Sequence, residues 1–278
     1  MDRRVYEKGT GGARVDQVTG LPVSDRKSSG KILARVYGYV AMGLAITAAV
    51  AFLVSFIMLR AIGPAVYGAG ATEAQIAAAS KAFNIYIVVL VVSGIPLLIL
   101  SLVLGFSFLR KKSVPHMMTL YVIYCALMGV VLSSLLVVGI DFYTIGEAFG
   151  ITALIFGVMA LIGHNSKINL GFGLTILFAL FMTTFLTFMI FLLIAAISGN
   201  IGMFWAVYGL SIAVSLITSV IVIFVIAFDS QQLKRAIASG EIDQYPHLEV
   251  FFAFHMYVDF INLFLRVLRV LLVLKNRN

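Results

Sequence analysis

Charged residues are scarce in this chain of 278 residues: Asp, Glu, Lys and Arg make up 12% of it, whereas hydrophobic residues make up 62%. Soluble domains carry roughly 25% charged and about 45–50% apolar residues, so the composition excludes an ordinary soluble domain. The apolar residues instead fall in runs of about twenty, and each run could cross about 30 Å of hydrocarbon as a helix. One integral membrane domain accounts for nearly all of the chain.

Cysteine and histidine are almost absent. The one cysteine, Cys125, lies in a hydrophobic run and cannot form an intrachain disulfide. Among the four histidines, His116, His164 and His247 are expected in loops, and no metal-ligand spacing is present, so we expect no metal site. The sequence has no Walker loop, dinucleotide fingerprint or nucleophile elbow, and its last run has no interior lysine for a Schiff base. We therefore expect neither an enzyme nor a cofactor.

The N-terminal segment, residues 1–31, is rich in Gly, Ser and charged residues and has too little apolar surface to fold. We expect it to be a disordered cytoplasmic tail before a single transmembrane domain over residues 32–278. It is too long and too charged for a signal-peptide n-region, which indicates that the first hydrophobic run is retained. An all-α polytopic membrane fold is expected, because backbone amides in lipid must be paired within helices. The predicted spans are Val36–Leu59, Phe83–Leu109, Met117–Val138, Gly146–Gly163, Leu170–Ile197, Met203–Phe228 and Val250–Leu274.

Small residues follow one face of the third predicted span, at Ala126, Gly129 and Ser133. Small side chains at helical spacing let helix backbones approach closely in a membrane. An incidental cluster of small residues is an equally good interpretation of the pattern.

The basic residues predict the orientation. With the N-terminus inside, fourteen Lys and Arg fall in inside segments before the last span and two fall outside, which favours a cytoplasmic N-terminus. These charges lack interleaved aromatics, so nucleic acid is not an expected partner. A seventh crossing would place Arg266, Arg269, Lys275 and Arg277 outside, against this rule. Either the last segment re-enters and returns, or it is a helix shielded by the other six.

The last span carries a polar stripe. At 100° per residue, His255, Asp259, Asn262, Arg266 and Arg269 fall within an arc of about 80°. Ionisable groups at this depth cost roughly 2.5–3.5 kcal/mol each, so the stripe should face protein or a wet cavity. Two interpretations compete: a structural network around the acid, or an ion or proton pathway in which the acid changes partners.

Asp229 ends the sixth span and is joined to the last span by a connection of about twenty residues. Helices joined by so short a link usually pack together, so the Asp229 and Asp259 carboxyl groups are expected to meet near the inner mouth. Such a pair could imitate the dyad of an intramembrane aspartyl protease, but the surrounding sequence fits that class poorly. Arg110 closes the second span, a position typical of an interfacial anchor. Glu147 opens the fourth span, where a helix N-terminus favours an acid, so we expect it to cap this helix.

Two C-terminal segments, Met256–Arg266 and Ala227–Lys234, closely resemble the signatures of the Bax inhibitor-1 family, also called the transmembrane Bax inhibitor motif family. Supporting matches are Gly43–Thr47, Ala126–Ser134 and Glu147–Ala153, and the resemblance extends from about Val36 to the C-terminus. The run Asp-Phe-Ile-Asn-Leu-Phe is quite specific, and the ordered set of motifs is more so.

The resemblance implies a seven-helix bundle with six helices around a central C-terminal helix, an inside N-terminus and a pH-sensitive calcium leak. It implies that Asp229 and Asp259 form a hydrogen-bonded proton sensor and that Arg110 can pair with Asp229 as a latch. The sequence departs from the family at His255, one turn from Asp259, where it could alter the pH response. It also departs in a connection over Arg60–Ala82 that is expected to be a long loop.

These observations predict a pH-sensitive cation leak channel, with Ca²⁺ as the expected ion, in the lipid bilayer of a bacterial inner membrane. Glu147, His255, Asn262 and Arg266 are accessory candidates. The alternative is a non-conducting interaction protein that modulates a membrane-bound protease or a stress response. A third interpretation is a proton-coupled transporter of a small solute.

Overall fold

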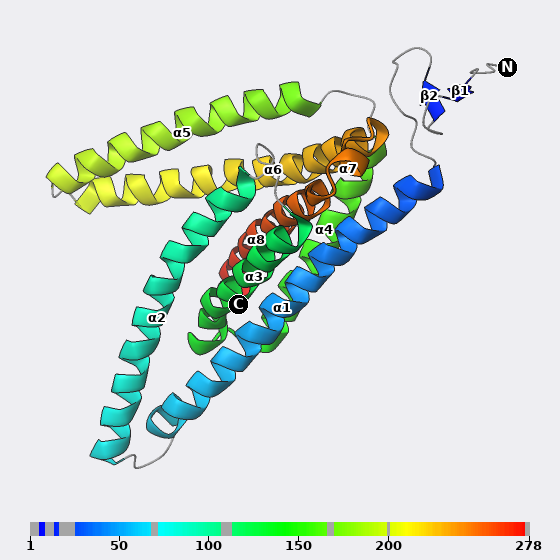
Figure 1. Cartoon of the computed structure of the whole chain (residues 1–278). Coiled ribbons are helices and arrows are strands. Elements are labelled where there is room, and N and C mark those ends of the chain that lie inside the picture. The colour runs from blue at the N-terminus through cyan, green and yellow to red at the C-terminus, as the bar shows by residue number, and fades with distance from the viewer. Residues whose placement is uncertain are drawn as a thin grey trace. The chain divides into compact units, whose positions relative to one another are not determined.

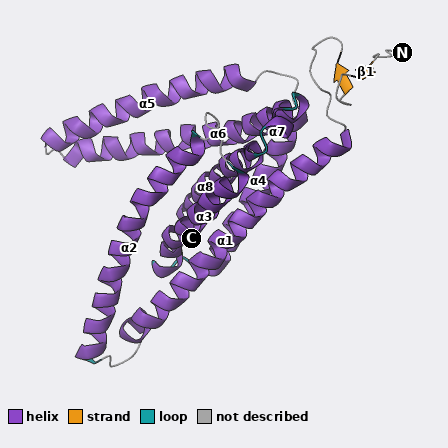
Figure 2. Ribbon diagram, viewed as in Figure 1, coloured by secondary structure: helices purple, strands orange, loops and turns teal. Residues whose placement is uncertain are grey.

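The computed structural model describes residues 6–8, 14–16, 26–67, 72–106, 113–165, 170–198 and 201–275. Nearly all of these residues are helical (Figure 2), which confirms the all-α fold class. In chain order (Figure 1) the helices are α1 Arg26–Tyr67, α2 Glu73–Gly105, α3 Val114–Val137, α4 Phe142–Asn165, α5 Leu170–Ser198, α6 Ile201–Ala238, α7 Glu241–Gln244 and α8 His247–Lys275.

The seven predicted spans each overlap one of the long helices. Five helices in the described part of the chain are long and apolar enough to cross a membrane. The chain is therefore a polytopic α-helical membrane protein. The five spans are Ser29–Gly63, Glu73–Gly105, Val114–Val137, Phe142–Asn165 and Ile217–Ala238.

Regular structure also occurs within the segment predicted to be a disordered tail. Strands β1, Tyr6–Lys8, and β2, Arg14–Asp16, pair antiparallel with Tyr6 opposite Asp16. Helix α1 begins at Arg26, before the predicted domain boundary at residue 32. Lys and Arg are good helix formers, so the helix can extend beyond the hydrophobic run into the basic segment.

The connection predicted as a long loop, Arg60–Ala82, is mostly helical, so that prediction is wrong. Helix α1 continues to Tyr67, and α2 begins at Glu73. A capping box starts α2: Gln75 Oε1 accepts from the Thr72 amide at 2.9 Å, and Thr72 Oγ1 accepts from the Gln75 amide at 3.4 Å. The segment was missed because its Glu, Gln and Lys residues make it too polar for a span. These residues and its many alanines nevertheless favour a helix.

Helix α8 excludes one of the two alternatives for the last segment. It runs without interruption over 29 residues, which at 1.5 Å per residue is about 43 Å. A re-entrant hairpin needs a turn within this stretch, so the re-entrant alternative is wrong. Buried residues occur along most of α8, from Leu248 to Leu268, as a helix shielded by protein requires.

The chain forms two compact units. The first comprises Met1–Ile145 and Ala236–Tyr257, and the second comprises Gly146–Arg235 and Val258–Asn278. Helices α4, α6 and α8 each continue from one unit into the other. Within the first unit, α1, α2 and α3 pack against one another.

The small-residue face of α3 is a packing surface in the first unit, which confirms the first of the two interpretations at Gly129 and Ser133. A Cβ on Gly129 would lie 2.7 Å from Thr47 O and 2.7 Å from Val50 Cβ of α1, so only glycine allows this approach. Ser133 is fully buried, and its hydroxyl shares a hydrogen bond of 2.9 Å with Tyr86 Oη of α2. One face of α3 therefore contacts both neighbouring helices.

Buried hydroxyl groups join α1, α3 and the first part of α8. Thr47 Oγ1 donates to Cys125 O at 3.0 Å and shares a hydrogen bond of 2.6 Å with Tyr257 Oη. The Tyr257 ring packs edge-on against Tyr121, with centroids 5.7 Å apart, and Tyr121 Oη donates to Tyr39 O. The polar groups are thus satisfied inside an apolar core.

Replacing Gly129 tests the close approach of α1 and α3. We expect Gly129→Ala to lower the apparent melting temperature of the detergent-solubilised protein, because overpacking of a core typically costs about 1–3 kcal/mol. The matched control is Gly38→Ala on α1, where a Cβ meets nothing within 4 Å. That variant should be neutral or slightly stabilising. Equal melting temperatures for the two variants would contradict the packing.

Candidate functional site

Asp229 of α6 and Asp259 of α8 meet within the second unit. A side-chain hydrogen bond joins their carboxyl groups. An ionised carboxylate only accepts hydrogen bonds, so this bond requires a proton on at least one of the two groups. One proton between the two carboxyl groups satisfies this requirement.

The carboxyl pair lies away from water. Asp259 is 8% exposed, Asp229 is half-buried, and the Oδ2 atoms of both residues are inaccessible to solvent. An ion taken out of water costs several kcal/mol in proteins unless it is well compensated. Two ionised carboxylates side by side would add mutual repulsion to that cost, so the shared proton stabilises the contact.

Helix α6 is fixed next to Asp229 by polar contacts to the preceding helices. Lys234 Nζ donates to the backbone oxygen of His164, near the end of α4, at 2.6 Å. Gln231 is buried, and its Oε1 accepts from the Leu170 amide, at the start of α5, at 3.4 Å. Both contacts satisfy backbone groups at helix ends, which have no partner inside their own helix. The turn of α6 that follows Asp229 is therefore anchored.

The polar stripe of α8 lies at the edge of its buried face. Burial decreases steadily across the predicted arc: Asp259 is buried, Arg266 and His255 are half-buried, and Asn262 and Arg269 are exposed. His255 lies against the ring of Phe251, with centroids 4.4 Å apart. The stripe as a whole does not turn toward protein. Only its Asp259 side does so.

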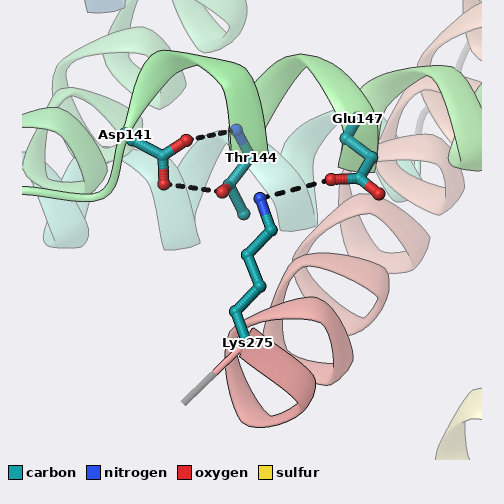
Figure 3. A network of polar contacts seen from close by, with 4 residues as sticks. All are labelled: Asp141, Thr144, Glu147 and Lys275. Carbon is teal, nitrogen blue, oxygen red and sulfur yellow. Dashed lines mark hydrogen bonds and ion pairs between the residues drawn. The ribbon is translucent and has the colours of Figure 1, made fainter. Parts of the chain in front are cut away.

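Glu147 does not cap α4. Asp141, which precedes the helix, takes that role: its Oδ2 accepts from the Thr144 amide at 2.7 Å and its Oδ1 from Thr144 Oγ1 at 2.6 Å. Glu147 lies in the second turn, where its Oε2 is 3.3 Å from Lys275 Nζ of α8, as Figure 3 shows. Both partners are about 40% exposed. The interpretation of Glu147 as a capping residue is therefore wrong, and its partner is a cation at the end of α8.

Arg110, the predicted latch, lies outside the described residues, and its pairing with Asp229 stays a prediction. The histidines expected in loops belong to helices instead: His116 to α3 and His164 to α4, while His247 begins α8. Within the described ranges, no group of three or more His, Cys, Asp and Glu side chains is placed to hold a metal ion.

Sequence reasoning missed an ion pair in the first unit. Arg35 Nη2 of α1 lies 2.8 Å from Glu249 Oε1 of α8, and the Glu249 side chain is 10% exposed. Each residue directly precedes a predicted span, and both spans are predicted to start on the cytoplasmic side. Opposite charges at two such positions were the signal for this contact, because a buried acid needs a partner.

Comparison with known proteins gives one family. The family model described as "Inhibitor of apoptosis-promoting Bax1" matches residues 30–277. The inner membrane protein YbhL of Escherichia coli K12 is 28% identical over 246 residues, which cover 86% of this chain and 89% of that protein. A membrane protein of Streptococcus pyogenes serotype M3, SpyM3_0260, is 27% identical over 247 residues, covering 86% and 91%. The protein RP147 of Rickettsia prowazekii is 33% identical over 156 residues, covering 55% and 60%.

The exposure of the ion pair between Glu147 and Lys275 predicts a weak contribution to stability. In a double-mutant cycle of Glu147→Gln and Lys275→Gln, we expect a coupling free energy of about 0.2–1 kcal/mol, the usual range for exposed pairs. Thermal unfolding in detergent at low and high salt measures it, and salt should reduce it. A coupling of several kcal/mol, insensitive to salt, would instead indicate a buried structural pair.

Proposed function

Because the chain belongs to the family of inhibitors of apoptosis-promoting Bax1, whose model covers residues 30–277, we propose that it is a pH-sensitive cation leak channel. The observation that supports this function is the hydrogen bond between the buried carboxyl groups of Asp229 and Asp259. These two residues are the proton sensor. The protein is not an enzyme and needs no cofactor for this role.

The shared proton couples the pH to the contact between α6 and α8. Two unit negative charges about 4 Å apart repel by about 4 kcal/mol at an effective dielectric constant of about 20. When the proton leaves, this repulsion favours an arrangement in which the acids separate or a cation lies near them. Ionisation of the pair therefore opens the route, and protonation closes it.

Other titratable groups modulate this switch. Among the described residues of the second unit they include His164 on α4, Lys234 on α6 and Arg266 on α8, and His255 lies one turn before Asp259 on the same helix. Because the pair is buried, its two acids interact more strongly with each other than with solvent or with distant charges. The pair is thus the group whose proton exchange dominates the response.

Ca²⁺ is the cation that we assign to the leak. Hard cations bind oxygen ligands, and carboxylates are the anionic oxygen groups at this site. The relative YbhL is named an inner membrane protein, which supports the inner membrane of a bacterium as the location. The excess of basic residues in the segments before and between the spans supports a cytoplasmic N-terminus.

Flux measured against pH tests the sensor. In proteoliposomes loaded with a Ca²⁺-sensitive dye, we expect wild-type flux to rise as the pH rises through the titration of the pair. Asp229→Asn and Asp259→Asn should each abolish this dependence, because an amide next to a carboxylate keeps a hydrogen bond without exchanging a proton.

The matched control for this experiment is Asp243→Asn, an exposed aspartate between α6 and α8 that should retain the wild-type pH profile. Flux from the Asp229 and Asp259 variants with an unchanged pH profile would refute the sensor assignment. If the wild-type protein conducts no cation at any pH, the non-conducting interaction protein becomes the better hypothesis.

Reporter fusions test the orientation. A fluorescent protein on the N-terminus should fluoresce, because it folds in the cytoplasm. With seven crossings, alkaline phosphatase on the C-terminus should be active, because it requires the periplasm. The positive-inside bias and the uninterrupted α8 together give this expectation. An inactive alkaline phosphatase on the C-terminus, or a non-fluorescent N-terminal fusion, would contradict the seven-span topology.

A further inference from the structure

One face of α4 contacts both helices that carry the acids. Phe149, Phe156 and Gly163 recur at intervals of seven residues, which is close to two helical turns, so they share this face. Phe149 and Phe156 both lie against the Phe260 ring of α8, with centroids 5.2 Å and 5.5 Å apart. Gly163 lies against Ala227 of α6.

The contact at Gly163 is made by backbone. A Cβ on Gly163 would overlap the carbonyl oxygen of Ala227 and lie 2.7 Å from its carbonyl carbon and 2.8 Å from its Cα. A backbone cannot yield as a flexible side chain can, so any larger residue must push α6 away from α4. The next residue, His164, accepts the hydrogen bond of Lys234 through its backbone oxygen, which holds α6 at the same place.

Each contact on α4 lies beside one of the acids. Ala227 precedes Asp229 by two residues, and Phe260 directly follows Asp259. Phe260 is 3% exposed and Phe156 is 7% exposed, so the aromatic contact with α8 is buried. Since α4 is one continuous helix, the distance from Phe156 to Gly163 sets where α6 and α8 are held along it.

We propose that Gly163 is a positioning residue of the carboxyl pair. By allowing the backbones of α4 and α6 to touch, it brings Asp229 within hydrogen-bonding reach of Asp259, whose helix is held on the same face of α4 by Phe156. Hydrogen bonds are lost within a few tenths of an ångström beyond about 3.2 Å, so a small displacement of α6 breaks the pair. The role in gating rests on the proposed function, but the hydrogen bond does not.

The charged and titratable groups on the helices around the pair define what else could change its protonation. Among the described residues of the second unit they are Glu147 and His164 on α4, Lys234 and Arg235 on α6, and Arg266, Arg269 and Lys275 on α8. His255 precedes Asp259 by one turn on α8. A substitution at Gly163 replaces none of these residues, but the displacement of α6 that it causes also moves Lys234 and Arg235, which lie on the same helix.

Infrared spectroscopy of the full-length protein in nanodiscs measures the coupling between the carboxyl groups of Asp229 and Asp259. The carboxylic C=O band of the pair is assigned by its loss in Asp259→Asn. In the wild-type background, Asp229→Asn should shift or remove this band. In a Gly163→Ala background, Asp229→Asn should leave the band of Asp259 unchanged, because the two groups no longer touch.

The matched control is Gly157→Ala on the same helix, where a Cβ meets nothing within 4 Å and the coupling should match that of the wild-type protein. If Gly163→Ala does not yield folded protein, Phe156→Leu serves as the second variant, since it loosens the α8 contact on the same face. Coupling retained in Gly163→Ala, or in Phe156→Leu where that variant replaces it, would overturn the positioning role.

Flux distinguishes the failure of this inference from the failure of the proposed function. Gly163→Ala should lose the pH dependence of Ca²⁺ flux, whereas Gly157→Ala should keep it. Loss of the infrared coupling without any effect on the pH profile leaves the positioning role standing and refutes the sensor. Intact coupling in Gly163→Ala refutes the positioning role whatever the flux.

Discussion

The second unit depends on the requirement that two buried carboxyl groups share a proton. Two carboxylates cannot both stay ionised in contact out of water, and neither can be moved to the surface while its helix remains packed. The bond between Asp229 and Asp259 is therefore conditional on protonation, unlike the apolar contacts around it. The proposed function uses this dependence of the helix contact on a proton.

Backbone contacts at glycine explain how so few polar groups suffice to hold the helices. Lipid chains are as apolar as leucine, so helices in a membrane gain little by burying apolar side chains against each other. Gly129 in the first unit and Gly163 in the second each bring a neighbouring helix to backbone contact, where dispersion forces are greatest. At Gly38, Gly150 and Gly157, by contrast, a Cβ would meet nothing within 4 Å, so these positions do not restrict the residue in this way.

Sequence reasoning predicted the helices and the pairing of Asp229 with Asp259, because hydropathy and the cost of buried charge are local properties of the chain. It failed at Glu147, whose partner Lys275 is 128 positions away, and at the connection Arg60–Ala82, where helix propensity outweighed polarity. It could not identify Gly163, since a glycine in a span looks the same whether or not a backbone touches it. Tertiary contacts, rather than composition, decided these cases.

Charged residues near both ends of α8 are paired with opposite charges on other helices. Its first turn holds Glu249, which is neutralised by Arg35, and its last turn holds Lys275, which lies beside Glu147. In the middle of the helix, Asp259 is paired with another acid, Asp229, through a side-chain hydrogen bond. Each end of α8 thus has an ion pair, while its middle has a contact between two acids.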